Sequence, residues 1–580
     1  MVLARKIWRK RTIKKMLIMN LIVIVVVLFF IICIDVEKSI SSGSFIGSAF
    51  LLGTLKTSTP NFSYDSLVDY VNLFNPNVSV PVSLIFTEKD TTKNAKEDSL
   101  GHYNKRGENI GCGTNDIKKW FRASYKYLSE SYLIVNDNAK ERISHAHTGI
   151  IDSLKQGQGV SYPGSEFYKG NGIVIVGGGV HSLMAYSVIQ IIRKSGTTLP
   201  IEVLIPEIKI SDADIPFCEI IEEHNAKCIY LKNYFSDRII NSNPFKGFQY
   251  KSIALLISSF ENVLMLDADD YPLLNINDIF DSPAFADNGM VIWPDLWRRT
   301  THPFFYESAN ITINFNKRIR NFADSFTDMS SKITENVDIK SELPYHDFQG
   351  TLPDPSSETG QFMVNKKTHW KSLLLSFYYN SFGPSTYYHL MSQYSAGQGD
   401  KETFIAAAHI LELPYYQVLS SITMDGYQKK DGSGFESSGY YQKNFIKDYE
   451  IKQEILKSDT LANDNDPNYS SVLFRDKYFS SQVTERDAMF AHCNFPKFNP
   501  MEMTYNKQFV YKGEHFRGLT HKQSLESMDL EREIYSTYYE ILCVNAENPL
   551  KQMISFYKGV TQDEVCKYLQ EKVKFLETPM

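Results

Sequence analysis

The sequence predicts an α/β fold in which strands and helices alternate along the chain. Short apolar runs typical of buried strands lie at residues 173–176, 201–205, 227–231 and 263–266. The segments between them have the spacing or the apolar character of helices, at residues 183–192, 212–225 and 248–260. This alternation is typical of a βαβ sheet with helices packed against it.

The first strand, Ile173–Val176, is fully apolar and is followed by the glycines 177–179. Such a strand is typical of the centre of a parallel sheet. The glycines predict a tight strand-to-helix turn, and no Gly-Lys-Ser/Thr follows, which excludes a P-loop. The turn lies at the edge of the sheet where ligands collect, so Gly178 is a candidate contact for a bound nucleotide. The plain alternative is a turn without ligand contact.

The fourth strand, Val263–Leu266, runs directly into Asp267-Ala268-Asp269. Two carboxylates just beyond the carboxyl end of a strand suit Mg²⁺ or Mn²⁺, which commonly bridges such acids to phosphates. The pattern is similar to the DxD motif of nucleotide-sugar glycosyltransferases. Asp-x-Asp also occurs by chance, and most such pairs are turn residues or solvated surface. The preceding strand favours a metal site at Asp267 and Asp269.

The N-terminus has the pattern of a membrane anchor. Residues 16–34 are apolar, with Asn20 as the one clearly polar interruption. As a helix this run would cover ~28 Å, close to the ~30 Å hydrocarbon core of a bilayer. Residues 1–15 are rich in Lys and Arg, which predicts a cytosolic tail and a lumenal remainder. The alternative is a cleaved signal peptide, which the length of the run and the lack of an Ala-x-Ala site in the sequence after it disfavour.

Beyond the anchor we expect a lumenal stem at residues 35–110, because Ser/Thr/Pro clusters and a long polar stretch occur there. Within it, residues 62–74 have the pattern of a helix. A lumenal catalytic domain is predicted at residues 111–580, with its core at residues 172–501.

Composition and cysteines set further limits. The chain is 43% hydrophobic, enough for a large core, and its formal charge of −6 argues against a nucleic-acid partner. An oxidising lumen permits disulfides. We expect Cys218 to pair with Cys228 and Cys543 with Cys566, although the sequence does not fix the connectivity.

Longer stretches carry a specific resemblance to a known family. They occur in order at residues 173–179, 199–203, 266–270, 293–303, 358–366, 378–384, 399–404 and 492–497. Over roughly residues 172–501 the chain resembles the fungal Golgi α-1,2-mannosyltransferases that branch the outer chain of N-linked mannan. The resemblance implies a GT-A glycosyltransferase fold, which is a Rossmann-like mixed sheet with flanking helices. It also implies GDP-mannose as the donor, Mn²⁺ as the cofactor and retention of the α-configuration.

The same resemblance implies a single-pass type II protein of the Golgi membrane. Its partners would be a mannan or N-glycan acceptor and a complex of mannosyltransferases. Two alternatives remain open. The related α-1,3-mannosyltransferases share the fold and the DxD motif. A catalytically silent mannan-binding subunit is the second alternative, and the intact pair Asp267 and Asp269 argues against it.

Residues 490–497 resemble the His-Phe-x-Gly-x-x-Lys segment that closes over the donor in glycogenin-like retaining transferases. In those enzymes the His binds the metal and the Lys contacts the diphosphate. By this resemblance His492 is the predicted third metal ligand and Lys497 the predicted diphosphate contact. The alternative for an isolated His is a hydrogen-bonded structural residue.

Retaining transfer also needs a group on the β-face of the mannose, either a weak nucleophile or a group that stabilises an oxocarbenium-like species. The candidates are Asp400 and Glu402, and then Glu358, whose segment we expect to precede a helix starting near Lys366. In the alternative interpretation, Asp400 is a helix N-cap and Glu402 a first-turn acid stabilised by the helix dipole.

Residues 293–303 mix aromatic, acidic and basic side chains directly after the metal motif. We predict a wall facing the sugar, in which Asp295 and His302 bind hydroxyl groups. Arg298 or Arg299 is an alternative contact for phosphate. The plain alternative is a packed loop.

Overall fold

The computed structural model describes residues 62–78, 82–84, 117–206, 214–243, 245–318, 327–328, 338–395, 397–457, 479, 488–519, 528–545, 548–555 and 557–578. The helices and strands named below belong to one compact unit, Ser63–Met580. The predicted tail at residues 1–15 and anchor at residues 16–34 lie outside the described residues. Within the described ranges, no helix has the length and apolar character needed to cross a bilayer.

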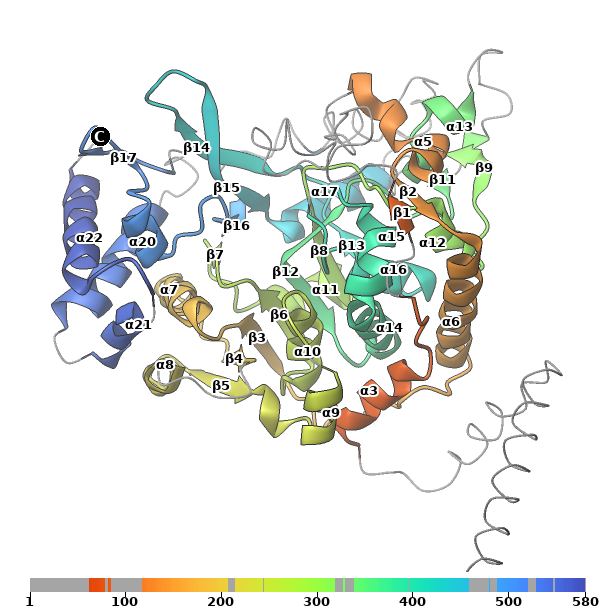
Figure 1. Ribbon diagram of the computed structural model, residues 1–580, viewed down its shortest axis with the longest axis horizontal. Coiled ribbons are helices and arrows are strands. Elements are labelled where there is room, and N and C mark those ends of the chain that lie inside the picture. Colours follow the sequence, from red (N-terminus) through yellow and green to blue (C-terminus); the bar gives the residue numbers. More distant parts are fainter. Residues whose placement is uncertain are drawn as a thin grey trace, which may run out of the picture. The chain divides into compact units, whose positions relative to one another are not determined.

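A seven-stranded sheet has the order β13-β8-β12-β6-β3-β4-β5 (Figure 1). Its strands are β3 (Asn171–Val176), β4 (Ile201–Ile205), β5 (Ala226–Tyr230), β6 (Asn262–Leu266), β8 (Met290–Pro294), β12 (Ser357–Asn365) and β13 (Tyr416–Gln417). The four strands expected from apolar runs, β3 to β6, pair in parallel. Strand β12 is antiparallel to its neighbours β6 and β8. The predicted α/β fold with a mixed sheet is confirmed.

Helices cover both faces of this sheet. Ile173 and Ile175 of β3 share a buried cluster with α7 (Val180–Lys194) and α8 (Asp214–Glu222). Side chains alternate along a strand, so Val174 points to the opposite face. There α10 (Gln249–Ile257) contacts β3 and β6, and α14 (Trp370–Ser381) and α16 (Thr403–Ile410) pack behind it.

The expected helix does not start near Lys366. Residues 357–365 form strand β12, and helix α14 begins only at Trp370. The polar start of β12 gave little strand signal, yet hydrogen bonding on both edges holds it in the sheet. Because β12 runs antiparallel to β6, its first residues lie at the edge where β6 ends. This pairing brings Glu358 near the Asp-x-Asp motif.

A second sheet brings the C-terminal part of the chain to the same edge. Its order is β14-β15-β16-β7. The strands are β7 (Asp270–Pro272), β14 (Thr423–Gln428), β15 (Phe435–Lys443) and β16 (Ala488–His492). Strand β7 starts directly after Asp269, and its residue Asp270 pairs with His492 of β16.

Helix α3 (Tyr64–Asn72) falls inside the predicted stem but packs against α14. The Tyr378 hydroxyl donates to the Phe74 carbonyl at 3.0 Å. Arg238 forms an ion pair with Asp69 at 2.8 Å. The segment predicted as stem is therefore not a spacer throughout, because residues from Ser63 onward contribute to the compact unit.

Two disulfides, Cys218–Cys228 and Cys543–Cys566, form as expected. The first joins α8 to β5. The second joins the π-helical turn Glu540–Val544, which follows α20 (Leu530–Tyr539), to α22 (Gln562–Glu577). Helix α20 packs against α22 and α7. The cysteine Cys493 is buried and free.

The remaining α-helices of the described residues are α5 (Tyr125–Glu130), α6 (Asp137–Lys155), α9 (Asp237–Ser242), α11 (Pro283–Asn288), α12 (Pro303–Glu307), α13 (Ile339–Glu342), α15 (Tyr388–Ser392), α17 (Phe445–Lys457), α19 (Pro500–Tyr505) and α21 (Gln552–Ser555). The remaining strands form small sheets: β1 (Val82–Leu84) with β2 (Leu133–Val135), β9 (Asn314–Arg318) with β10 (Thr327–Asp328) and β11 (Phe348–Gln349), and β17 (Val510–Tyr511) with β18 (Glu514–His515).

Candidate active site

The Asp-x-Asp motif lies at the carboxyl end of β6, between the two sheets. The backbone N–H of Asp267 donates to the Gly360 carbonyl of β12 at 2.7 Å, and that of Asp270 to the Asp267 carbonyl at 3.2 Å. These bonds fix the turn that presents the two carboxylates. The Asp269 side chain is almost completely buried, whereas that of Asp267 is 24% exposed.

His492 reaches this turn from β16. Its Nε2 lies 3.4 Å from Asp269 Oδ1. One ligand atom from each of Asp267, Asp269 and His492 falls within 4.8 Å of the others. Lys497 forms an ion pair with Asp269. The structure thus brings together the three residues predicted as metal ligands and the predicted diphosphate contact.

The donor set of this group fits a divalent cation. Carboxylate oxygens suit Mg²⁺ and Mn²⁺, and an imidazole nitrogen is a ligand common to transition metals, so the combination favours Mn²⁺. The local charges also fit. Burial alone would raise the pKa of the Asp269 carboxyl, but the charges of His492 and Lys497 hold it well below its usual value. Burial opposes a charged His492, yet the facing Asp269 carboxylate raises the pKa of the imidazole to about 10. A cation that binds His492 would have to displace a proton.

Lys251 of α10 is a site residue that the sequence did not reveal. Its Nζ lies 2.9 Å from Asp267 and 3.7 Å from Asp400 Oδ2, and it donates to the Thr359 carbonyl at 2.9 Å. Burial raises the pKa of Asp267, and the Lys251 charge opposes that rise. Lys251 therefore links the metal motif to the candidate acid Asp400.

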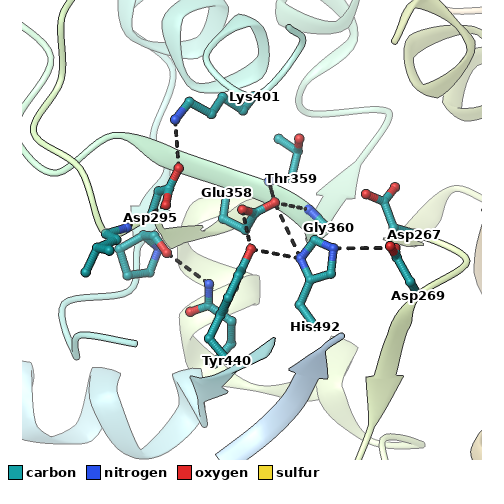
Figure 2. A network of polar contacts seen from close by, with 12 residues as sticks. Asp267, Asp269, Asp295, Glu358, Thr359, Gly360, Lys401, Tyr440 and His492 are labelled. Atoms are coloured by element: carbon teal, nitrogen blue, oxygen red, sulfur yellow. Dashed lines mark hydrogen bonds and ion pairs between the residues drawn. The ribbon is translucent and has the colours of Figure 1, made fainter. Parts of the chain in front are cut away.

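Glu358 lies on the side of His492 opposite to Asp267 and Asp269 (Figure 2). Its Oε1 accepts the backbone N–H groups of Thr359 at 2.8 Å and Gly360 at 2.7 Å. Its Oε2 accepts the hydroxyl of Tyr440 at 2.6 Å, and that hydroxyl also lies 2.9 Å from His492 Nδ1. Burial would raise the pKa of Glu358, but His492 and the Tyr440 hydrogen bond lower it. Glu358 is therefore held as a carboxylate.

The acids before α16 have separate environments. The helix starts at Thr403 with no side-chain cap from Glu402, and the Asp400 carbonyl, not its carboxylate, accepts the Thr403 N–H. The alternative interpretation of Asp400 as a helix N-cap is therefore wrong. Burial and the neighbouring Asp267 raise the pKa of Asp400 to about 6 although Lys251 opposes the rise. Such a pKa suits a group that acts near neutral pH.

Glu402, in contrast, belongs to the protein interior. Its carboxylate forms an ion pair with Arg299 and accepts the Ser357 backbone N–H at 3.0 Å. Both side chains are buried. Glu402 thus anchors the start of β12, and its carboxylate is already used in holding the fold.

The predicted sugar-facing wall is mostly a packed loop. Arg298 and Arg299 are buried, with Arg298 paired to Asp354. His302 accepts the Phe304 N–H at 3.0 Å with Nδ1, as the N-cap of α12, and its Nε2 lies 3.2 Å from the Leu133 carbonyl. Both ring nitrogens therefore have backbone partners, which corrects the expected sugar contact of His302 and the phosphate contact of the arginines.

Asp295 is the member of that wall that stays close to the site. Lys401 Nζ donates to its Oδ2 at 2.7 Å (Figure 2). Burial raises the pKa of Asp295, Lys401 lowers it, and nearby Glu358 raises it again. Asp295 and Glu358 are therefore electrostatic neighbours.

Gly178 occupies the turn between β3 and α7, at the predicted edge of the sheet. Its φ of 94° lies in the left-handed region that glycine tolerates. Its N–H donates to Ser182 Oγ at 2.9 Å, and the Ser182 hydroxyl donates to Asp214 at 2.7 Å. The turn is thus held by its own hydrogen bonds, and contact with a nucleotide stays a prediction.

The chain is similar to known mannosyltransferases. Residues 170–450 match a family model described as "Mannosyltransferase putative". The chain is 37% identical to Alpha-1,2-mannosyltransferase MNN2 of Saccharomyces cerevisiae, over 81% of this chain and 79% of that protein. It is 32% identical to Alpha-1,2-mannosyltransferase MNN5 of the same species, over 98% of each. Alpha-1,2-mannosyltransferase MNN21 of Candida albicans is 35% identical, over 78% of this chain and 68% of its own length.

The chain belongs to the mannosyltransferase family of these yeast proteins.

The chain also has a distant likeness to two solved structures. The galactosyltransferase LgtC has a TM-score of 0.24 at 10% identity, over 43% of this chain and 73% of that chain. Mouse xyloside xylosyltransferase 1 has a TM-score of 0.25 at 12% identity, over 43% of this chain and 85% of that chain.

The part of this mannosyltransferase that matches the family model contains Asp267, Asp269, Glu358 and Asp400, whereas His492 and Lys497 lie beyond it. The sequence alone does not reveal Lys251 and Tyr440 as site residues. Lys251 sits in a predicted helix, where a lysine usually indicates a solvated face. Tyr440 lies in a hairpin with no motif of its own.

Proposed function

We propose that this protein is a type II Golgi enzyme that transfers mannose from GDP-mannose, with retention, to the 2-hydroxyl of an α-linked mannose on N-glycan outer-chain mannan. Membership of a family whose relatives are named α-1,2-mannosyltransferases supports the reaction. The observation that carries the proposal is the convergence of Asp267, Asp269 and His492 at one strand end. A GT-A fold is part of the proposal, and the mixed sheet with helices on both faces supports it.

Asp267, Asp269 and His492 would hold the divalent cation. When bound, such a cation stabilises the negative charge that develops on a departing diphosphate. Lys497, which forms an ion pair with Asp269, would supply a second positive charge for the diphosphate. Breaking the bond between mannose C1 and the diphosphate oxygen leaves an electron-poor C1. The new bond forms from the acceptor 2-oxygen, whose proton passes to the departing diphosphate.

The acids around the site have different tasks in this proposal. Asp400, with Lys251 beside it, is the candidate group for the β-face of the sugar. Asp295 and Lys401 lie near Glu358, away from the metal motif, and are candidates for binding acceptor hydroxyl groups. Glu402 has no catalytic role here, because Arg299 and Ser357 occupy its carboxylate.

The test is a transfer assay with the full-length protein in detergent, GDP-mannose, Mn²⁺ and α-mannobiose, followed by linkage analysis of the product. A new α-1,2 bond is the expected result. An α-1,3 bond would keep the enzyme class and overturn the linkage. No turnover with any α-mannoside acceptor, from protein that binds Mn²⁺ and GDP, would favour a silent mannan-binding subunit. Residence in the Golgi is tested separately, by imaging the tagged chain in a fungal cell.

A further inference from the structure

We infer that Tyr440 is a positioning residue that holds the His492 ring, with Glu358 behind it, so that Nε2 is presented on the side of the two aspartates. The inference rests on the proposed metal-dependent function. It adds to that function a named residue outside the ligand set, on a strand that carries none of the predicted ligands.

The Tyr440 hydroxyl has one proton and two possible acceptors, Glu358 and His492. Glu358 accepts two backbone N–H groups through one carboxylate oxygen, at 2.8 and 2.7 Å, so it is stabilised as an acceptor-only carboxylate. The phenol has one proton, and it donates that proton to the other oxygen at 2.6 Å. Toward His492 Nδ1, 2.9 Å away, the phenol oxygen therefore acts as the acceptor.

The same contact determines which nitrogen of the His492 imidazole has a free lone pair. If Nδ1 carries the proton that the phenol oxygen accepts, the lone pair of a neutral ring is on Nε2. Nε2 is the nitrogen that lies 3.4 Å from Asp269 Oδ1. Hydrogen bonds of this kind set the tautomer and ring orientation of histidines that bind metals.

Glu358 cannot hold the ring alone. Its Oε1 lies 3.8 Å from Nδ1, which is beyond hydrogen-bond distance. Tyr440 bridges that gap, and Figure 2 shows its hydroxyl between the carboxylate and the ring. The contact is shielded from solvent, because Tyr440 is 9% and His492 5% exposed. Little water can compete for the three partners.

The backbone explains why Tyr440 is available. It pairs directly with His492 across β15 and β16, so both side chains leave the same face of that sheet. Glu358 comes from β12 of the other sheet. The hydrogen bonds among the three residues therefore tie the two sheets together at the point where the Asp-x-Asp turn lies.

Tyr440→Phe removes only the bridging hydroxyl. The neighbouring Tyr441→Phe is the matched control, because Tyr441 also donates to a buried carboxylate, Asp425, at 2.7 Å, but lies on the opposite face of β15. Mn²⁺ affinity is measured on the full-length proteins in detergent, from the electron paramagnetic resonance signal of free Mn²⁺ during a titration. Thermal unfolding of both variants reports any general loss of stability.

We expect Tyr440→Phe to weaken Mn²⁺ binding by about 10–100-fold, the range for the loss of a partner that orients a metal-binding histidine. Tyr441→Phe should stay within about twofold of the parent, a deviation too small to indicate loss of an orienting partner. In a His492→Ala background, Tyr440→Phe should have little further effect, because the ring that it positions is gone.

Unchanged Mn²⁺ affinity in Tyr440→Phe would overturn the inference and leave the proposed function intact. An equal loss in Tyr441→Phe, or an undiminished loss in the His492→Ala background, would also overturn it, because Tyr440 would then act through general stability or another route. A parent protein that binds no Mn²⁺ would reject the metal-dependent function itself, and the inference with it.

Discussion

Gly360 lies directly against the ring of His492. A Cβ atom added at Gly360 would stand 2.5 Å from His492 Nδ1 and 2.6 Å from Cε1, closer than real Cβ contacts. The same glycine accepts the Asp267 N–H through its carbonyl and donates its own N–H to Glu358. One residue of β12 thus contacts the metal motif, the imidazole and the acid behind it.

Gly360→Ala should therefore displace His492 without unfolding the protein. We expect at least about a tenfold loss of Mn²⁺ affinity, since a misplaced ligand costs as much as a lost orienting partner. Metal titration and thermal unfolding of the same sample measure the two effects. Gly432→Ala, in a hairpin turn where a Cβ meets nothing but φ is +80°, strains the backbone far from the ring and is the control for a general loss of stability. Parent-like metal affinity in Gly360→Ala would show that the ring has more freedom than the structure indicates.

Changes at His492 and Lys497 should separate metal binding from donor binding. His492→Ala removes the proposed third metal ligand and should weaken Mn²⁺ binding. Lys497→Ala leaves all three ligands in place and should chiefly raise KM for GDP-mannose. Titrations of Mn²⁺, and of GDP at saturating Mn²⁺, distinguish the two variants. If both variants bind Mn²⁺ and GDP as the parent does, the segment from Phe490 to Lys497 has only a structural role.

Substitution of Asp400 should lower activity, whereas substitution of Glu402 should lower stability. Asp400→Asn should lower kcat by ~10²-fold or more, the effect of losing an acid, base or charge-stabilising group, with little change in melting temperature. Glu402→Gln leaves the buried Arg299 charge without its partner and should cost about 3 kcal/mol of stability. Activity and thermal unfolding of both variants decide the matter. A stable, inactive Glu402→Gln would reverse the assignment.

Ionisation of Asp400 should make both kcat and folding stability depend on pH. Its pKa is raised to about 6 by burial and by Asp267, so the carboxylate becomes the main form above about pH 6. If the ionised form is required, kcat should rise with pH up to about 6 and then level, and Asp400→Asn should lose that limb. Because the folded-state pKa lies above the ordinary value, ionisation of Asp400 should also cost folding stability as pH rises from about 4 to about 6. A pH–rate profile with no limb near 6 in the parent would remove Asp400 from this role.

Part of this site could be predicted from the sequence because its signals are local. The apolar runs of β3 to β6 and the pair Asp267 and Asp269 are contiguous in the chain. The resemblance of residues 490–497 to a known segment predicts His492 and Lys497. In each case the residue and its context are close together in sequence.

The rest depends on pairings that no local pattern reveals. Strand β12 begins with Ser-Glu-Thr-Gly, a poor strand sequence, and is held by β6 and β8. Arg299 has the same local appearance whether it meets phosphate or Glu402, and only the fold brings Glu402 to it. Tyr440 meets Glu358 across 82 positions of sequence. Such contacts require the three-dimensional structure.

The most direct test of the central claim is mannose transfer from GDP-mannose by the full-length protein after metal removal. We expect EDTA to abolish transfer and Mn²⁺ to restore it. Asp269→Asn should stay at least about 10²-fold below the parent at all Mn²⁺ concentrations, while its thermal unfolding in EDTA remains cooperative. Full activity of the metal-free parent, or of Asp269→Asn, would contradict the assignment of Asp267, Asp269 and His492 as the metal site of this enzyme.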